Sequence, residues 1–151
     1  MTDPTEHSRE EAARTLHRAF NDRDREAFLA CLVDDVTWHV EGQHPMAGTY
    51  HGREDLWDGY FGPMWQSPAR WEDHEVRDHG DHVVALGEVF HNFGEGERGW
   101  RTVEVLTLRD GRVAERRAFT SGQPELDRFI SRGCAADPEA AGPEASETAV
   151  P

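Results

Sequence analysis

The 151-residue sequence has no lysine, only two cysteines and no apolar run of membrane-spanning length. Cys31 and Cys134 are too few for a disulfide framework, and Cys31 fits a small buried side chain on a helix. No N-terminal apolar run indicates a signal peptide. We therefore expect a cytoplasmic protein.

Positive charge is also scarce. Sixteen arginines stand against thirty acidic residues, which gives a formal net charge of -14. Nucleic-acid binding needs clustered cations that displace counterions, and anionic membranes attract basic segments. The composition therefore argues against nucleic acid and membrane surfaces as partners.

Patterns typical of metal and cofactor sites are missing. No histidine pair has the helical spacing of four, and neither an HxH nor a CxxC motif occurs. His74, His79 and His82 flank one turn, and their gathering in space is the remaining alternative for a metal. "TSGQ" around Ser121 is not a nucleophile elbow. We expect no metal and no cofactor.

Three helices are expected in the first half of the chain. Ser8 and Glu11 form a capping box for the first helix, and Asp24 caps a short second one. The alternation of "DDVTWHV" predicts a strand over 34–40. A loop rich in glycine and proline follows, and the pattern of 53–65 predicts a third helix that Gly62-Pro63 breaks or kinks.

The second half reads as strands. The segment "HVVALGEVFHNF" is apolar on both faces, and Asp110-Gly111 is a strong hairpin signal between two further strands. "PELDRFI" predicts a last short helix. Residues 135–151, rich in Ala, Pro, Glu and Gly, are expected to be a disordered acidic tail. The fold class is α+β, with one domain over 1–134.

This order of elements, with "DDVTWHV", "GTYHGREDL" and "DGRVAERRAF" in place, resembles the nuclear transport factor 2-like fold. Within that fold the likeness is to SnoaL-like proteins, which include polyketide cyclases, and it spans Glu6 to Ser131. The resemblance implies a cone-shaped α+β barrel: N-terminal helices pack on a curved, mostly antiparallel sheet that encloses a pocket. It also implies a homodimer formed through the outer face of the sheet.

Strand alternation gives the side chains expected to face this pocket. They are Val36, Trp38, Val40, Val84, Leu86, Glu88, Phe90, Asn92, Trp100, Thr102, Glu104, Leu106, Leu108, Arg116, Ala118 and Thr120. Tyr60 and Trp65 from the third helix complete the aromatic lining, with Tyr60 as the preferred anchor for a ligand oxygen.

Glu88 and Glu104 interrupt otherwise apolar faces, where an unpaired charge is costly. One interpretation makes one of them a general acid or base whose apolar surroundings tune its pKa toward neutral pH, with Arg116 on the neighbouring strand. A second is a buried Glu–Arg pair that only fixes register. A third is a bulge that turns the carboxylate to water.

Three histidines remain to be placed. Alternation puts His39 and His91 outside the pocket. His44, in the loop before Pro45, lies where the related folds have the pocket mouth. It either shuttles a proton near neutral pH or caps the turn.

The resemblance also exposes departures. In ketosteroid isomerases the general base is an aspartate, and this chain has Val40 at that position. The tyrosine of their oxyanion hole corresponds to Leu16. The acidic residue of the oxyanion hole corresponds to Glu104, so only this position keeps an acidic side chain. Limonene epoxide hydrolases keep an aspartate where this chain has Ala118. Both familiar mechanisms are therefore not expected.

The first hypothesis is a cofactor-independent acid–base enzyme that isomerises, cyclises or hydrates a hydrophobic oxygenated metabolite, such as a polyketide or terpenoid. Glu88, Glu104, Arg116 and His44 are its candidate catalytic residues. The alternative is a non-catalytic ligand-binding or accessory dimer with the same pocket. A third class, a scaffold dimer, would have its pocket filled by side chains.

Overall fold

The computed structural model describes residues 4–92, 94 and 96–136, which form one mixed α+β unit. Its helical segments are α1 (Pro4–Asp22), α2 (Arg25–Ala30), α3 (Arg53–Leu56), the π-helical η1 (Trp57–Phe61), α4 (Gly62–Met64) and α5 (Gln123–Ala136). Its strands are β1 (Leu32–Val40), β2 (Gly48–His51), β3 (Ala69–Asp78), β4 (Val83–His91), β5 (Arg98–Arg109) and β6 (Arg112–Thr120).

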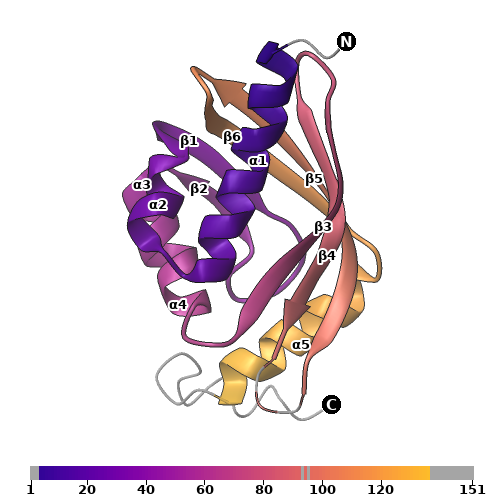
Figure 1. The fold of residues 1–151 in the computed structure, drawn as a ribbon. Helices are drawn as coiled ribbons and strands as arrows, with labels where there is room; N and C mark the ends of the chain where they lie inside the picture. The colour runs from indigo at the N-terminus through magenta and orange to yellow at the C-terminus, as the bar shows by residue number, and fades with distance from the viewer. Residues whose placement is uncertain (1–3, 93, 95, 137–151) are drawn as a thin grey trace.

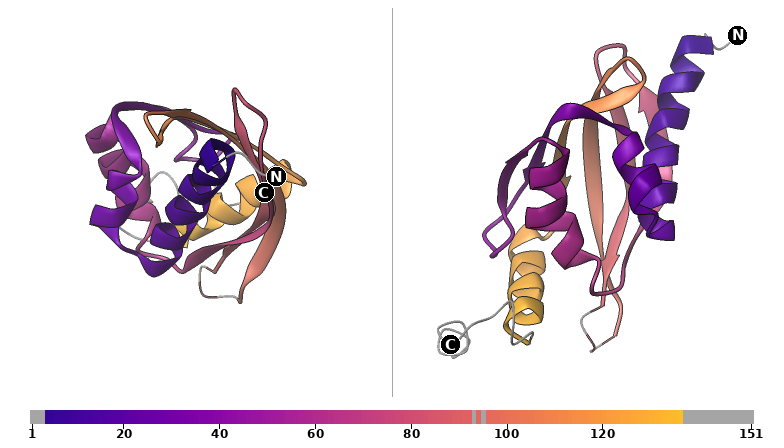
Figure 2. Two further views of the ribbon diagram at one scale, coloured as in Figure 1. Left: turned by 45° about the horizontal axis from the view of Figure 1, so that its top comes forward. Right: turned by 90° about the vertical axis from the view of Figure 1, so that its left-hand side faces the viewer.

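The strands form a single curved, open sheet in the order β2-β1-β6-β5-β4-β3. β1 pairs with β6 in parallel, and the other neighbours are antiparallel. Helices α1 to α4 lie on the concave side of this sheet, and α5 lies at one end of it (Figures 1 and 2). This arrangement confirms the predicted α+β class and the cone-like plan.

The N-terminal helix begins earlier than predicted. α1 starts at Pro4, so Ser8 lies inside the helix and does not cap it. Proline suits a first helical turn because its missing N–H would have no intrahelical partner there. The second cap is confirmed, since Asp24 accepts a hydrogen bond from the Ala27 amide at 3.1 Å.

The third helical region is continuous but irregular. α3, η1 and α4 follow one another directly, and the wider π-helical turn ends where Gly62-Pro63 begins. Strand β2 was not predicted, because its residues stand in a stretch punctuated by glycines, which is typical of a loop.

The hairpin prediction is confirmed at Asp110-Gly111. Both residues have positive φ angles, 54° and 78°, as a tight hairpin turn requires.

The facing of β4 was predicted wrongly by one residue. Val83 and Ala85 are fully buried, whereas Leu86 is 39% exposed. Ala85 pairs with Glu104 of β5, and directly paired residues share a face of the sheet. Because the strand is apolar on both sides, its alternation alone does not reveal which side faces the helices.

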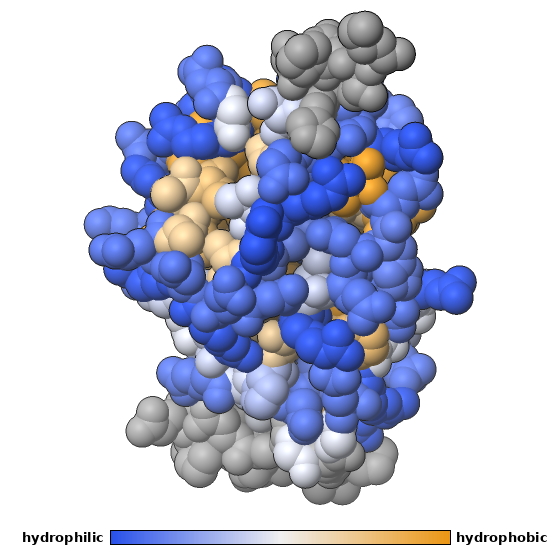
Figure 3. All heavy atoms as spheres, in the orientation of Figure 1, coloured by the Kyte–Doolittle hydropathy of each residue, from blue (hydrophilic) through white to orange (hydrophobic). Residues whose placement is uncertain are grey.

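The face that carries α1 is mostly hydrophilic, with small apolar areas between charged residues (Figure 3). Among the residues that the structure describes, no helix combines the length and apolarity needed to cross a membrane. The predicted tail begins too early, since α5 continues through Ala136. The rest of that tail, 137–151, lies outside the described residues.

Candidate functional site

A cavity opens between α1, the helical segment 53–64 and the concave face of the sheet. It holds about 450 Å³ of space not filled by atoms, part of it open to solvent. Its lining is aromatic and aliphatic with a few polar groups: Leu16, His17, Phe20, Phe28, Trp38, Tyr60, Phe61, Met64, Trp71, Val89, His91, Glu104 and Arg116. Small-molecule sites are typically built in this way.

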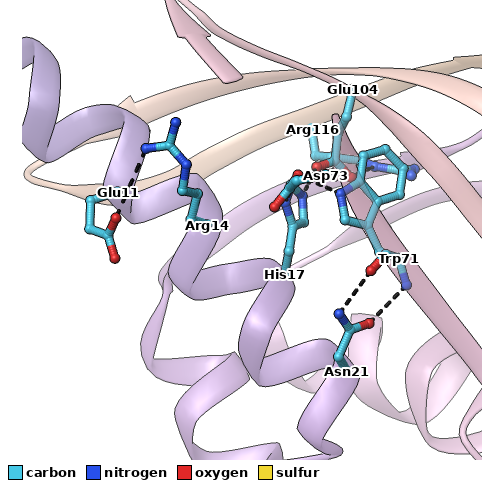
Figure 4. Close-up of polar contacts among 8 residues, drawn as sticks. All are labelled: Glu11, Arg14, His17, Asn21, Trp71, Asp73, Glu104 and Arg116. Atoms are coloured by element: carbon cyan, nitrogen blue, oxygen red, sulfur yellow. Dashed lines mark hydrogen bonds and ion pairs between the residues drawn. The ribbon is translucent and has the colours of Figure 1, made fainter. Parts of the chain in front are cut away.

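His17 of α1 stands between two carboxylates on the sheet (Figure 4). Its Nε2 lies 2.5 Å from Oε1 of Glu104, and both side chains are buried. Its Nδ1 lies 2.9 Å from Oδ1 of Asp73, an ion-pair contact that is not aligned as a hydrogen bond. A helix and two separate strands therefore meet at one imidazole.

Arg116 of β6 completes the network from the other side. Its Nε donates to Oε2 of Glu104 at 2.9 Å, and its Nη1 donates to the backbone carbonyl of His39 at 2.8 Å. The guanidinium carbon also lies 4.9 Å from the centre of the Trp38 ring, a cation–π contact. Both oxygens of Glu104 thus bind cationic side chains.

These contacts determine which groups carry charge. Burial alone would lower the pKa of His17, but the charges of Glu104 and Asp73 outweigh it and raise that pKa to about 9. Burial would raise the pKa of Glu104, but His17 and Arg116 outweigh it and lower that pKa to about 2. Near neutral pH the network therefore contains an imidazolium and two carboxylates, together with the Arg116 guanidinium.

Neighbouring side chains hold His17 in place. Asn21, one turn further along α1, exchanges two hydrogen bonds of 2.8 Å with the backbone of Trp71 (Figure 4). The Trp71 indole donates to Asp73 at 2.6 Å, and its ring centre lies 4.8 Å from that of His17. One tryptophan therefore positions both the imidazole and the carboxylate.

Two further polar side chains reach the cavity. Burial raises the pKa of the Tyr60 phenol, so this group stays protonated. Burial, with a smaller effect of His44, lowers the pKa of His91 to about 4, so this imidazole is neutral at neutral pH. His91 was expected to point outward, and it faces inward because β4 has the opposite facing.

Four predicted site residues line the cavity: Trp38, Tyr60, Glu104 and Arg116. Glu88 does not. It pairs with Arg101 on the outer face of the sheet, where its side chain is 29% exposed and lies 3.7 Å from His74. Its predicted place in the pocket was wrong for the same reason as the facing of β4.

The same reversal moves Phe90 to the outer face, where Arg70 stacks on its ring at 3.9 Å. Asn92 follows the end of β4 and does not line the cavity. His44 does not line it either: its Nδ1 accepts a hydrogen bond from the Met46 amide at 3.2 Å. This contact favours the turn-capping alternative over proton transfer.

The other predicted pocket residues pack elsewhere. Trp100 is covered by α5, with its ring 5.1 Å from that of Phe129. Thr120 contacts Thr102 at 3.0 Å. The others do not line the cavity either: Val36, Val40, Trp65, Val84, Leu106, Leu108 and Ala118. Most of them are buried in the surrounding core.

Sequence reasoning missed His17 and Asp73. A signal for His17 existed, since Ala13, Leu16, His17 and Phe20 have the spacing of one helical face, and all four are buried. A histidine on the apolar stripe of a helix needs a buried partner. No comparable signal marked Asp73, which lies in an acidic strand.

Within the described part of the chain, no group of three or more His, Cys, Asp or Glu side chains has the arrangement needed to hold a metal ion.

A comparison with curated proteins gave no match. Among solved structures, the chain is similar to a nuclear transport factor 2-like protein of unknown function from Burkholderia pseudomallei. The TM-score is 0.73 at 22% identity, over 82% of this chain and 97% of that one. It is also similar to TerC, co-crystallised with polyporic acid, with a TM-score of 0.71 at 21% identity and the same coverage, 82% and 97%.

A candidate polyketide cyclase from Sinorhizobium meliloti is a more distant neighbour, with a TM-score of 0.60 at 16% identity over 72% of this chain and 94% of that one. At such identities the likeness shows a shared fold and does not bear on activity. The model of the SnoaL-like domain family matches residues 13–116, most of the described chain. The chain therefore belongs to the SnoaL-like domain family and has the nuclear transport factor 2-like fold.

Proposed function

We propose that the protein is a cofactor-independent enzyme that isomerises, cyclises or hydrates a hydrophobic, oxygenated metabolite by proton transfer. The observation that carries this proposal is the His17–Glu104 pair, with 2.5 Å between Nε2 and Oε1, in the wall of a largely apolar cavity. Perturbed titratable pairs in clefts are frequent at active sites.

The pair offers an acid and a base side by side. The His17 imidazolium, whose Nε2 contacts Glu104, can donate that proton to a ligand oxygen. Loss of this positive charge removes a main cause of the lowered Glu104 pKa, so the carboxylate becomes a stronger base and can accept a proton from a ligand carbon. Asp73 and Arg116 act as positioning residues, because they hold the far side of the imidazole and the second carboxylate oxygen. The aromatic walls would bind the carbon skeleton.

The comparisons support the ligand class. One neighbour is a candidate polyketide cyclase, and TerC was co-crystallised with polyporic acid. We therefore propose an aromatic polyketide-like or terpenoid-like substrate for this cavity as well.

The test begins with a thermal-shift screen of lipophilic oxygenated metabolites, polyporic acid among them, since a ligand of the native state raises the melting temperature. Compounds that bind are then incubated with the enzyme and the products identified by mass spectrometry. We expect His17→Gln and Glu104→Gln to lower turnover by about 100-fold or more, as general acid–base groups do. Glu88→Gln is the matched control.

Rates are measured where circular dichroism shows each variant folded. Turnover at the wild-type rate in folded Glu104→Gln would remove Glu104 from the mechanism.

A second candidate function is ligand binding without catalysis. It is favoured by the engagement of both Glu104 oxygens with protein cations, as in a structural ion pair. In that case the screen would yield thermal shifts without any product.

We also propose that two copies associate through the outer face of the sheet. Leu86 pairs with Val103, and Val103 pairs with Phe119, so the three form one apolar row across β4, β5 and β6. Leu86 is 39% exposed and Phe119 60%, the two large apolar side chains exposed among the described residues. A self-complementary sheet face suits a two-fold dimer.

Phe119→Arg should convert this dimer to a monomer, because it replaces the most exposed member of the apolar row by a charge. Light scattering coupled to size exclusion measures the mass. Glu26→Arg, an exposed charge change on α2, serves as the control and should leave the dimer intact. A monomeric wild-type protein would refute this interface.

A further inference from the structure

Asp73 joins the wall of the cavity to the outside of the molecule. Its side chain is 27% exposed, whereas the side chains of His17 and Glu104 are 6% and 5% exposed. Asp73 belongs to the edge strand β3 and does not line the cavity. His17 does line it, and its Nδ1 lies 2.9 Å from Oδ1 of Asp73. A single imidazole therefore separates the cavity from a carboxylate that meets bulk water.

A β-bulge gives Asp73 this position. The register of β3 with β4 shifts between Asp73 and Glu75, so His74 is an extra residue in its strand. A bulge bends its strand and redirects a side chain, and bulges are over-represented next to active sites. This one lies on an edge strand that packs against α1, the helix that carries His17 (Figure 4).

Gly87 of β4 leaves room for the group that orients the carboxylate. It pairs with Asp73, and a Cβ atom at Gly87 would lie 2.7 Å from Cζ2 of Trp71, closer than side chains pack. The indole lies over this glycine and donates its Nε1–H to Oδ1 of Asp73 at 2.6 Å. Oδ1 is also the oxygen next to His17, and among the residues that the structure describes none donates a hydrogen bond to Oδ2. The bulge, the glycine and the tryptophan together hold one oxygen at the imidazole and leave the other without a protein donor.

The two nitrogens of His17 face opposite ways. Nε2 meets Glu104 in the cavity wall, and Nδ1 meets Asp73. An imidazole can take up a proton at one nitrogen while it releases another from the second nitrogen. A hydrophobic ligand in the cavity would exclude water from the Nε2 side. Protons would then reach bulk water from the Asp73 side.

We propose that Asp73 carries protons between His17 and bulk water, on the side of the imidazole away from the cavity. In the outward direction the Nδ1–H bond breaks, and the proton passes to a carboxylate oxygen of Asp73 and from there to water. The neutral imidazole then accepts a proton at Nε2 from Glu104 or a ligand, which restores the imidazolium. The inward direction reverses these steps.

This proposal rests on the proposed function, in which His17 and Glu104 exchange protons with a ligand. Asp73 acts through His17 and does not touch that ligand. The contact of Nδ1 with Oδ1 is not aligned as a hydrogen bond, so the transfer includes a rotation of the carboxylate, which its partial exposure permits.

The test follows the exchange of the His17 ring N–H protons with water by nuclear magnetic resonance, so it does not require turnover. It is done at pH 6 on the folded protein, where nitrogen chemical shifts verify that His17 is an imidazolium. Asp73→Asn keeps an oxygen for the Trp71 indole and removes the proton acceptor. We expect Nδ1–H exchange to slow by about 10-fold or more, because a positioned acid–base group accelerates proton transfer.

A purely electrostatic role of Asp73 predicts the opposite sign. Loss of the carboxylate lowers the pKa of His17, which makes its N–H more acidic and its exchange faster. Asp73→Glu restores a carboxylate, so its exchange should be faster than that of Asp73→Asn.

Two further variants separate the possible routes. Glu72→Gln is the matched control, because Glu72 precedes Asp73 in the strand but pairs with Arg70 and His74. It should leave the exchange unchanged. Val89→Phe narrows the cavity, which Val89 lines, and should also leave Nδ1–H exchange unchanged. This variant tests the route even if Asp73→Asn does not fold.

Exchange that is equal or faster in folded Asp73→Asn would overturn the proposal, and so would exchange that slows about 10-fold in Val89→Phe. If His17→Gln keeps full turnover while Asp73→Asn shows the slow exchange, only the proposed catalysis is refuted. If turnover needs His17 but exchange does not depend on Asp73, only the proton route is refuted.

Discussion

Replacing Glu104 by glutamine should lower the free energy of unfolding by about 3–5 kcal/mol, the usual cost of removing one partner from a buried ion pair. The carboxylate is buried and binds His17 at 2.5 Å and Arg116 at 2.9 Å. Glutamine has nearly the same shape but leaves Arg116 without its carboxylate partner and leaves His17 with Asp73 alone. Urea denaturation at pH 6 measures the change, and the melting temperature should fall by about 10 °C.

Glu88→Gln is the control for this experiment. The substitution is chemically identical, but Glu88 lies on the outer face of the sheet with a partly exposed side chain. Exposed ion pairs contribute little, so its cost should stay below about 1 kcal/mol. If the two variants lose similar stability, Glu104 is not the buried centre of a charged network.

Stability should depend on pH with a maximum near pH 6.5. His17 has a folded-state pKa of about 9 against 6.5 in the unfolded chain. Its contribution is therefore complete below pH 6.5 and is lost as the pH rises through about 9. This difference corresponds to about 3 kcal/mol, lost progressively between those values.

The loss of stability below pH 6.5 has different causes. His91 stays neutral in the folded protein down to a pKa of about 4, while the unfolded chain binds a proton below 6.5. The folded state therefore loses stability as the pH falls from 6.5 towards 4. Glu104 contributes fully above 4.5, its ordinary pKa, and its contribution is lost as the pH falls through about 2.

Urea denaturation from pH 4 to pH 9 measures the free energy of unfolding on the acid and alkaline sides of the maximum. His17→Gln should abolish most of the stability loss between pH 6.5 and 9 and keep the loss between 6.5 and 4. His91→Gln should keep the alkaline loss and abolish most of the acid one. An alkaline loss that persists unchanged in His17→Gln would show that another group causes it.

Local signals in the sequence predict much of this fold. Asp24 supplies a helix cap and Asp110-Gly111 a turn, and both act over a few residues, so neither depends on tertiary structure. The alternation of β1 is equally clear, because Val36, Trp38 and Val40 are separated by polar residues. This is why Trp38 was placed correctly at the cavity.

β4 lacks such a contrast. Val84, Leu86 and Phe90 on one face are as apolar as Val83 and Val89 on the other. The facing is determined by pairing with β5, a tertiary interaction that hydrophobic alternation does not contain. The errors at Glu88, Phe90 and His91 share this one cause.

The network around His17 depends on contacts between distant parts of the chain. His17 and Glu104 are 87 residues apart in sequence. Position 104 was predicted because a glutamate on an apolar strand face stands out. His17 lies on the apolar face of α1, but its sequence does not show which carboxylates it meets, and Asp73 stands among other polar residues. The packing of α1 on the concave face of the sheet brings His17 to Asp73 of β3 and Glu104 of β5.

The central claim is that a protonated His17 lies between Asp73 and Glu104 at the cavity wall. Its most direct test is a nuclear magnetic resonance titration of the His17 ring nitrogens in the folded wild-type protein. The structure predicts an imidazolium at pH 7.5 that loses its proton only near pH 9. A His17 ring that is neutral at pH 7.5 would contradict the account.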